Sequence, residues 1–298
     1  MRYVKKTGTP VEAEGKRLTK TFVEGCWNEA IRQYENLFYD RHRLADFGPV
    51  LLREQKDDKG NYCCYCMRKL FLENTADGHK ANVTFEHIVP HRIKFSEWNE
   101  DKDKYTSFPN LDSDHITICF DGELTEKQKT LKMVNMPFPH YVSYHNLVAS
   151  CDGVTFEGEA FNSSRCCNNR RQERFVMPIF LSKALSSGIK YTSKGELDYD
   201  DSVYDFRWFD AEHLNLTNAW ITLVRRIWYR ISRSEYTDCH VEQARIDKVL
   251  RQEIIDDVDS NNEISAWAES DSAWNLFSEY SWFYDYYNSR YNVITRND

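Results

Sequence analysis

The placement of the cysteines constrains the fold of this chain more than any other feature. Cys63 and Cys66 are separated by two residues, and Cys151 and Cys167 offer a second pair much later in the chain, with Cys166 adjacent. Two thiolates at the first spacing provide half of a tetrahedral zinc site and need a second pair from elsewhere. We therefore expect a structural Zn²⁺ that joins two distant segments, the alternative being ordinary buried thiols.

Composition indicates a globular protein that does not enter the membrane. Apolar residues make up 41% of the 298 residues, but no run reaches the roughly 18 to 20 apolar residues that a spanning helix needs. The segment MRYVKKTGTP lacks the apolar stretch of a secretory signal. We expect a cytoplasmic protein, in a reducing compartment where clustered thiols bind metal more often than they form disulfides.

The net charge of −8 does not exclude a nucleic acid, because the charge is unevenly distributed. Residues 252–289 contain nine acidic residues and no Lys or Arg, which leaves a net charge of +1 for the rest. The acidic, aromatic segment could dock a partner, shield a basic surface or simply pack as helices. Arginines gather in two stretches that could follow a nucleic-acid backbone or form a solvated face: Arg165, Arg170, Arg171 and Arg174, then Arg225, Arg226, Arg230 and Arg233.

Hydrophobic patterning predicts a mixture of helices and strands. A long amphipathic helix is expected over 16–45, and a strand over 83–89 is stopped by Pro90. Residues 96–139 are expected to be irregular, and a second strand should follow at 141–148. The remaining expectations are a hairpin at 154–161, a helix that opens in the cluster 165–171, and a largely helical C-terminal third.

The strand over 83–89 carries an adjacent carboxylate and imidazole, Glu86 and His87. A carboxylate can hold a hard divalent cation, and a neutral imidazole can take a proton from an attacking water molecule. Phosphodiester hydrolysis needs both functions. The alternative is a structural histidine whose hydrogen bonds are satisfied within the strand.

The ordered motifs Cys-x-x-Cys, Glu-His-Ile-x-Pro, Asn-Leu-x-x-x-Cys and Cys-Asn-x-x-Arg resemble the zinc-stapled branch of the HNH nucleases over about residues 60–175. The resemblance implies an α+β fold with a ββα-metal core. The implied organisation is a helical N-terminal region over 1–57, a nuclease core with its zinc site over 58–178, and a mainly helical region over 179–298.

The resemblance also assigns roles to particular residues. It implies that Glu86 and Asn168 bind a catalytic Mg²⁺ or Mn²⁺, that His87 is the general base, and that Asn146 orients it. Residues expected to meet the nucleic acid are Arg171, Arg170 and His91. Because the last two cysteines are farther apart than usual, Cys166 could replace Cys167, and the register of Asn168 and Asn169 could shift by one.

The chain further resembles the nuclease subunits of Septu and related retron-associated bacterial anti-phage systems. That resemblance implies DNA as the substrate and an ATPase as the protein partner. Two alternatives are a tRNA-directed RNase of the same fold, and a zinc-stapled adaptor that binds nucleic acid or protein without catalysis. His87→Ala separates the adaptor from the enzymes, because an adaptor keeps its function.

Overall fold

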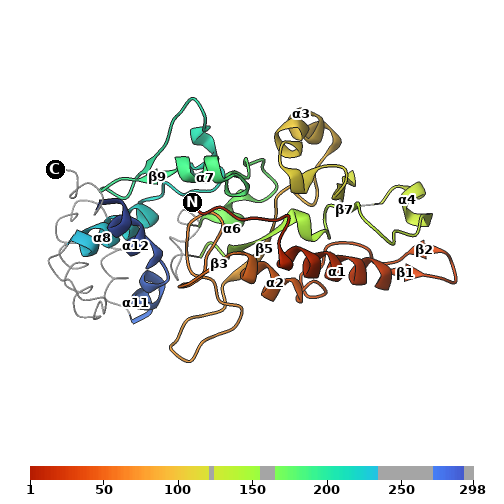
Figure 1. The fold of residues 1–298 in the computed structure, drawn as a ribbon, viewed down its shortest axis with the longest axis horizontal. Coiled ribbons are helices and arrows are strands. Elements are labelled where there is room, and N and C mark those ends of the chain that lie inside the picture. The colour runs from red at the N-terminus through yellow and green to blue at the C-terminus, as the bar shows by residue number, and fades with distance from the viewer. Residues whose placement is uncertain (121–123, 155–164, 234–270, 292–298) are drawn as a thin grey trace.

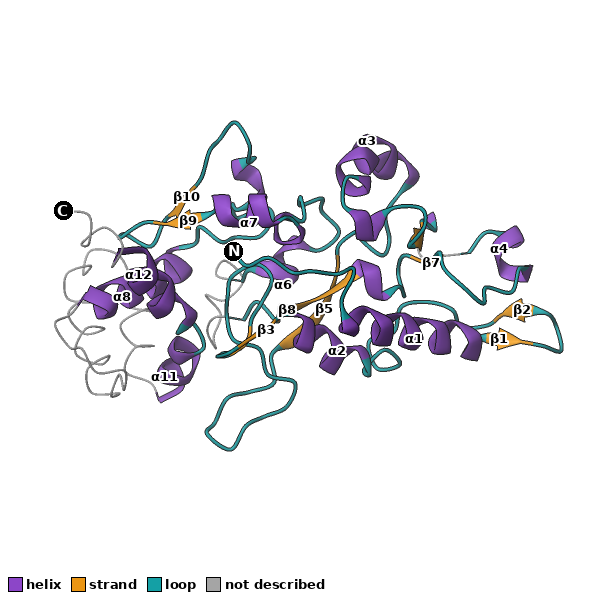
Figure 2. Cartoon of the chain, viewed as in Figure 1, coloured by secondary structure: helices purple, strands orange, loops and turns teal. Residues whose placement is uncertain are grey.

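The computed structural model describes residues 1–120, 124–154, 165–233 and 271–291. These residues form a mixed α+β protein, as predicted, in which every sheet described is two-stranded. The molecule is elongated (Figure 1), with α8, α11 and α12 at one end and α4, β1 and β2 at the other. Figure 2 shows that long loops connect these small elements. With such small sheets, much of the core is built from loop and helix side chains.

A strand, a second strand and a short helix form the centre of the structure. β5 (Val83–His87) pairs antiparallel with β8 (Leu147–Cys151), with His87 opposite Leu147, and α6 (Cys167–Arg171) contacts β8. The strand predicted at 83–89 is present but ends at His87, and the helix predicted within 165–171 begins at Cys167. The second strand begins at Leu147 instead of Tyr141, because Tyr144–Asn146 form the 3₁₀-helix η3, capped by the Ser143 side chain.

The N-terminal segment corrects the prediction of one long helix. α1 (Pro10–Gly25) begins behind a Thr9 cap with proline in its first turn, and ends well before Ala45. The Asn28 side chain then accepts a hydrogen bond from the Ala30 amide, a local turn that competes with helix formation. The elements that complete this segment are β1 (Trp27–Asn28), β2 (Gln33–Tyr34), α2 (Phe47–Glu54), β3 (Lys56–Asp57) and β4 (Gly60–Asn61).

The stretch between the two central strands is also more regular than predicted. Its longest element, α3 (Phe95–Thr106), buries only Tyr105, so it lacks the apolar period that reveals a helix in a sequence. Thr125 and Gln128 form a capping box at the start of α4 (Glu126–Thr130). The other elements are η1 (Pro109–Leu111), β6 (Ile116–Thr117) and β7 (Phe138–Pro139), with β6 and β7 parallel.

The C-terminal part contains the predicted helices. α8 (Ala219–Arg233) packs against α12 (Trp282–Tyr291), and α11 (Asp271–Ser278) precedes the latter. The region before them holds η4 (Ile179–Leu181), α7 (Lys183–Gly188), β9 (Lys190–Tyr191), β10 (Leu197–Asp198) and η5 (Phe206–Trp208). Arg225 is fully buried in α8 and donates to the Leu216 carbonyl, so it does not belong to a nucleic-acid-binding face.

The link between α11 and α12 is bonded to the segment that follows the first cysteine pair. Glu279, an acidic residue of the C-terminal segment, is buried in an ion pair with Arg68 and hydrogen-bonded to His79. Arg68 also binds Asp152, just after β8. This part of the acidic segment therefore packs as ordinary structure. Residues 252–270, and the predicted hairpin apart from Val154, lie outside the described residues.

Candidate catalytic and metal-binding sites

Four buried cysteines meet at one end of the central strands. Their sulfurs lie within 4.8 Å of one another; Cys63 and Cys167 are 3.8 Å apart, and Cys66 and Cys151 are 3.6 Å apart. Zn–S bonds of about 2.3 Å place the sulfurs of a tetrahedral site about 3.8 Å apart. The cluster could therefore hold a metal ion such as zinc. Cys167 is the fourth member, and the Cys166 sulfur lies beside the cluster, 3.5 Å from that of Cys167 and 3.9 Å from the Gly153 carbonyl.

Tight backbone turns bring these thiols together. The Cys63 amide donates to the Arg68 carbonyl and the Met67 amide to the Cys63 carbonyl, which closes a loop around Cys66. Met67 and Cys167 both have positive φ, at 67° and 56°, a strained conformation for these residues. Burial raises the pKa of the Cys66 and Cys167 thiols well above the usual value. Metal binding would oppose that effect, because metals bind the thiolate form.

Glu86 is buried on β5, and the charge of its carboxylate is compensated by Arg171. Arg171 of α6 forms an ion pair with Glu86 Oε1, and Tyr65 Oη donates to the same oxygen at 3.0 Å. The Arg171 guanidinium also donates to the carbonyls of His87 and Ile88, at 2.6 and 2.7 Å. Burial raises the pKa of the Glu86 carboxyl, whereas the Arg171 charge lowers it. The second oxygen, Oε2, is the one that remains to meet a cation.

Arg171 does not lie where the sequence analysis expects it. Its side chain is about 1% exposed and is bonded to β5 and the loop behind it, so it holds the strand instead of facing solvent. Arg170 donates to the Ala211 carbonyl. Both arginines of α6 are thus engaged within the protein in this conformation.

His87 points away from Glu86, because consecutive strand residues face opposite sides. Its Nε2 lies 2.9 Å from the Tyr141 carbonyl, which can only accept, so Nε2 carries the proton and Nδ1 holds the lone pair. The ring packs edge-on against Tyr39, with centroids 4.4 Å apart, and lies 5.0 Å from the His91 ring. Burial lowers the pKa of His87 well below its usual value. The imidazole is therefore neutral and can accept a proton at Nδ1.

Asn146 positions the segment that follows His87. Its side-chain oxygen accepts from the Val89 amide at 2.7 Å, and its nitrogen donates to the carbonyls of Val89 and His140, at 2.8 and 3.0 Å. The Asn146 carbonyl accepts from the Ile88 amide at 2.9 Å. Asn146 thus acts on the backbone around His87.

Asn168, at the start of α6, faces β5. Its Nδ2 donates to Thr84 Oγ1 at 3.2 Å and to the Phe85 carbonyl at 3.4 Å, which leaves Oδ1 as its available ligand atom. The neighbouring Asn169 is exposed and binds the Asp152 carbonyl. The structure therefore favours Asn168 over Asn169 as the residue directed at the strand.

A basic pocket of about 700 Å³ lies beside His87. Tyr39 and Tyr141, which both contact His87, line it together with His91, Arg92 and Lys129, and none of the described residues in its lining is Asp or Glu. Of these residues the sequence analysis identified only His91. Tyr39, Lys129 and Tyr141 were missed because they come from segments predicted as a long helix, an irregular loop and a strand, and Arg92 belongs to none of the predicted elements.

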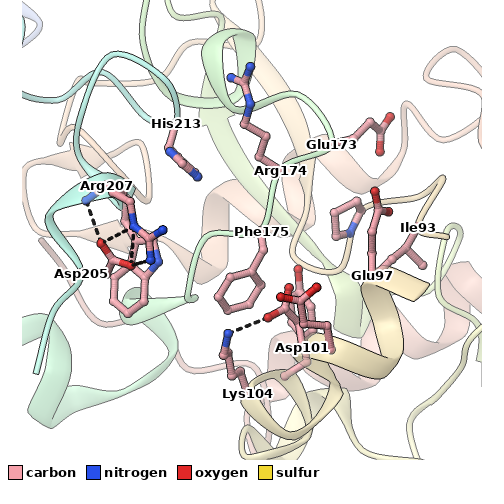
Figure 3. Close-up of a pocket in the computed structure, with 14 residues that line it drawn as sticks. Ile93, Glu97, Asp101, Lys104, Glu173, Arg174, Phe175, Asp205, Arg207 and His213 are labelled. Carbon is pink, nitrogen blue, oxygen red and sulfur yellow. Dashed lines mark hydrogen bonds and ion pairs between the residues drawn. The ribbon is translucent and has the colours of Figure 1, made fainter. Parts of the chain in front are cut away.

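A second pocket, of about 470 Å³, has the opposite character. Figure 3 shows that Lys104 is paired with Asp101 and Arg207 with Asp205. Five acidic and three basic residues line it, so it does not favour a phosphate group. The pocket beside His87 also has paired cations, since Lys129 lies 2.8 Å from Glu126 and His91 lies 3.7 Å from Glu173. Of the two pockets it is still the better match for a polyanion, because the described residues that line it include no acid.

No family model, curated protein or solved structure matches this chain. No described helix is both long and apolar enough to cross a membrane. The function is therefore inferred from the residues of the two sites.

Proposed function

We propose that this protein is a metal-dependent HNH endonuclease that hydrolyses phosphodiester bonds in DNA. The observation that carries the proposal is the placement of Glu86 and His87 at the end of β5, which pairs with β8 beside α6. The order strand, strand, helix is the order that the resemblance implies. The cysteine centre supports the proposal because it joins the ends of β8 and α6.

Two side-chain oxygens are suited to the catalytic cation. Glu86 Oε2 and Asn168 Oδ1 belong to residues whose other polar atoms are already bonded, to Arg171 and Tyr65 for the first and to β5 for the second. Both are hard oxygen ligands of the kind Mg²⁺ and Mn²⁺ prefer. When bound, such an ion stabilises negative charge on the scissile phosphate.

His87 has the proton arrangement of a general base. Because its ring and the Glu86 carboxylate face opposite sides of β5, the proposal requires the scissile phosphate to lie across the end of the strand, where both can reach it. The Tyr141 carbonyl holds its Nε2 proton, so Nδ1 takes the proton from the attacking water. Asn146 keeps the adjacent backbone in place through Val89 and His140. The basic pocket beside the ring offers Arg92 and His91 to the nucleic-acid backbone.

A non-catalytic adaptor is the second candidate, and one observation favours it. Arg171 already neutralises Glu86 within the protein, as a structural ion pair would. In an adaptor the Glu86–Arg171 pair serves only to bind α6 to β5. The two candidates differ in whether His87 and Glu86 are needed for any activity.

Cleavage of plasmid DNA and of total RNA tests the proposal. The wild type should cut DNA with Mg²⁺ or Mn²⁺ and not with chelator, and His87→Ala should lower the rate by about 10² to 10⁴-fold. His213→Ala is the matched control, because this histidine contacts Asp210 and lines the acidic pocket. Preferential RNA cleavage would replace DNA with RNA as the substrate. Equal activity in His87→Ala would refute the catalytic proposal.

The anti-phage role is a separate part of the proposal. If the protein is the nuclease subunit of a Septu-like system, it should copurify with an ATPase and protect cells from phage only when both are present. Protection by the His87→Ala variant together with the ATPase would contradict a nuclease effector.

A further inference from the structure

A second cluster of metal-ligating side chains lies outside the cysteine centre. Glu12 of α1, His115 next to β6 and His145 of η3 each offer a ligand atom, and these atoms lie within 4.8 Å of one another. His145 Nε2 is 3.2 Å from Glu12 Oε1, and the two imidazole rings are 4.5 Å apart. Three segments distant in sequence thus converge on one point.

His115 and Glu12 each use one polar atom in a hydrogen bond within the protein, as metal ligands commonly do, and keep the other atom for the cluster. His115 Nδ1 lies 2.7 Å from Asp112 Oδ1, so Nδ1 donates to the carboxylate and Nε2 keeps its lone pair. Metal-bound histidines commonly have their other nitrogen held by a carboxylate in this way. Glu12 Oε2 accepts from the Gly8 amide at 2.7 Å, which leaves Oε1 for the cluster.

The burial of these side chains also supports a metal site. Glu12 and His145 are buried, and His115 is partly exposed, so the cluster is enclosed on one side and open on the other. Two histidines and one carboxylate with an open position form a zinc-type ligand set. On these grounds we propose that Glu12, His115 and His145 bind a divalent transition metal, with zinc as the best match.

Two lysines lie near the cluster. Lys16 is 2.6 Å from Glu12 Oε1, but its side chain is about a third exposed and can leave when a cation binds. Lys6 is buried and is paired with Glu54 at 2.7 Å, so its charge is already balanced. The metal would therefore replace Lys16 as the partner of Glu12 Oε1.

The site would hold together the backbone that supports Asn146. His145 precedes Asn146, its carbonyl accepts from Asn110 Nδ2 at 2.8 Å, and α1 packs against η3. A bound ion would join α1 to this segment and to the stretch before β6. This role does not depend on nuclease activity.

Counting bound metal tests the inference independently of activity. The full chain, saturated with Zn²⁺ and freed of excess, should retain one ion more than His115→Ala. His213→Ala is a close control, because His213 also contacts an aspartate three residues earlier and is equally exposed, at 20%. Equal numbers of ions in the wild type and in His115→Ala would overturn the inference.

Two further measurements test the inference even if His115→Ala fails to fold. Lys16→Ala should tighten binding of the ion at this cluster about two- to fivefold, because it removes a competing cation from a partly exposed pair. Co²⁺ at this site should show weak visible bands without the intense sulfur charge-transfer bands of the cysteine site. Unchanged affinity in Lys16→Ala, with only sulfur-type Co²⁺ spectra, would show a purely hydrogen-bonded cluster.

Discussion

The cysteine centre and the Glu86 centre both adjoin the β5–β8 pair, but they differ in how buried charge is balanced. The four thiols are neutral when protonated, so they can stand together in the buried cluster without a counter-charge. Glu86 is equally buried, and a buried carboxylate needs a partner, which Arg171 provides. The comparison teaches that protonated thiols can cluster in the interior without a counter-charge from the protein, whereas a buried carboxylate needs one.

The largest effect is expected from the cysteine centre. Cys63→Ser should abolish metal binding there and remove cooperative folding, because structural zinc binding contributes on the order of 10 kcal/mol to folding. Near-ultraviolet circular dichroism and metal content measure the two losses. Cys119→Ser is the control, since Cys119 is buried but lies outside the cluster. A Cys63→Ser protein as stable as the control would show that the thiols are ordinary core residues.

A smaller loss of stability is expected at the Glu86 centre. Glu86→Gln leaves the Arg171 charge buried without its anion and should cost about 3 kcal/mol in urea unfolding. Glu86→Gln combined with Arg171→Met should recover much of that loss, because both charges are then removed. Glu14→Gln, which breaks the exposed pair with Arg53, should cost less than about 1 kcal/mol. Equal costs for Glu86→Gln and Glu14→Gln would contradict the contrast between buried and exposed pairs.

The smallest effect concerns the pocket beside His87. Arg92→Ala should weaken DNA binding a few-fold and lower the slope of affinity against salt by about one, since one phosphate contact is lost. Arg207→Ala, in the acidic pocket, should leave both unchanged. The salt dependence of binding, measured for both variants, tests this. A greater loss in Arg207→Ala would place the nucleic acid in the acidic pocket.

The local motifs were predictable to different degrees. The strand that carries Glu86 and His87, and the helix that starts at Cys167, were predicted from residues close in sequence. The first helix was predicted too long, because apolar periodicity continues past the turn that Asn28 forms. α3 was missed, because a helix that buries one residue leaves almost no hydrophobic pattern.

The sequence by itself determined which side chains could form a thiol centre and which adjacent pair could act on a phosphodiester. Spacing and residue type are enough for that, because metal ligands and proton acceptors belong to few side chains. Only the tertiary structure decided that Cys167 closes the thiol cluster, that Arg171 balances Glu86, and that Glu12 meets two histidines. These contacts join segments far apart in sequence, and their energy depends on burial and distance, which no local pattern contains.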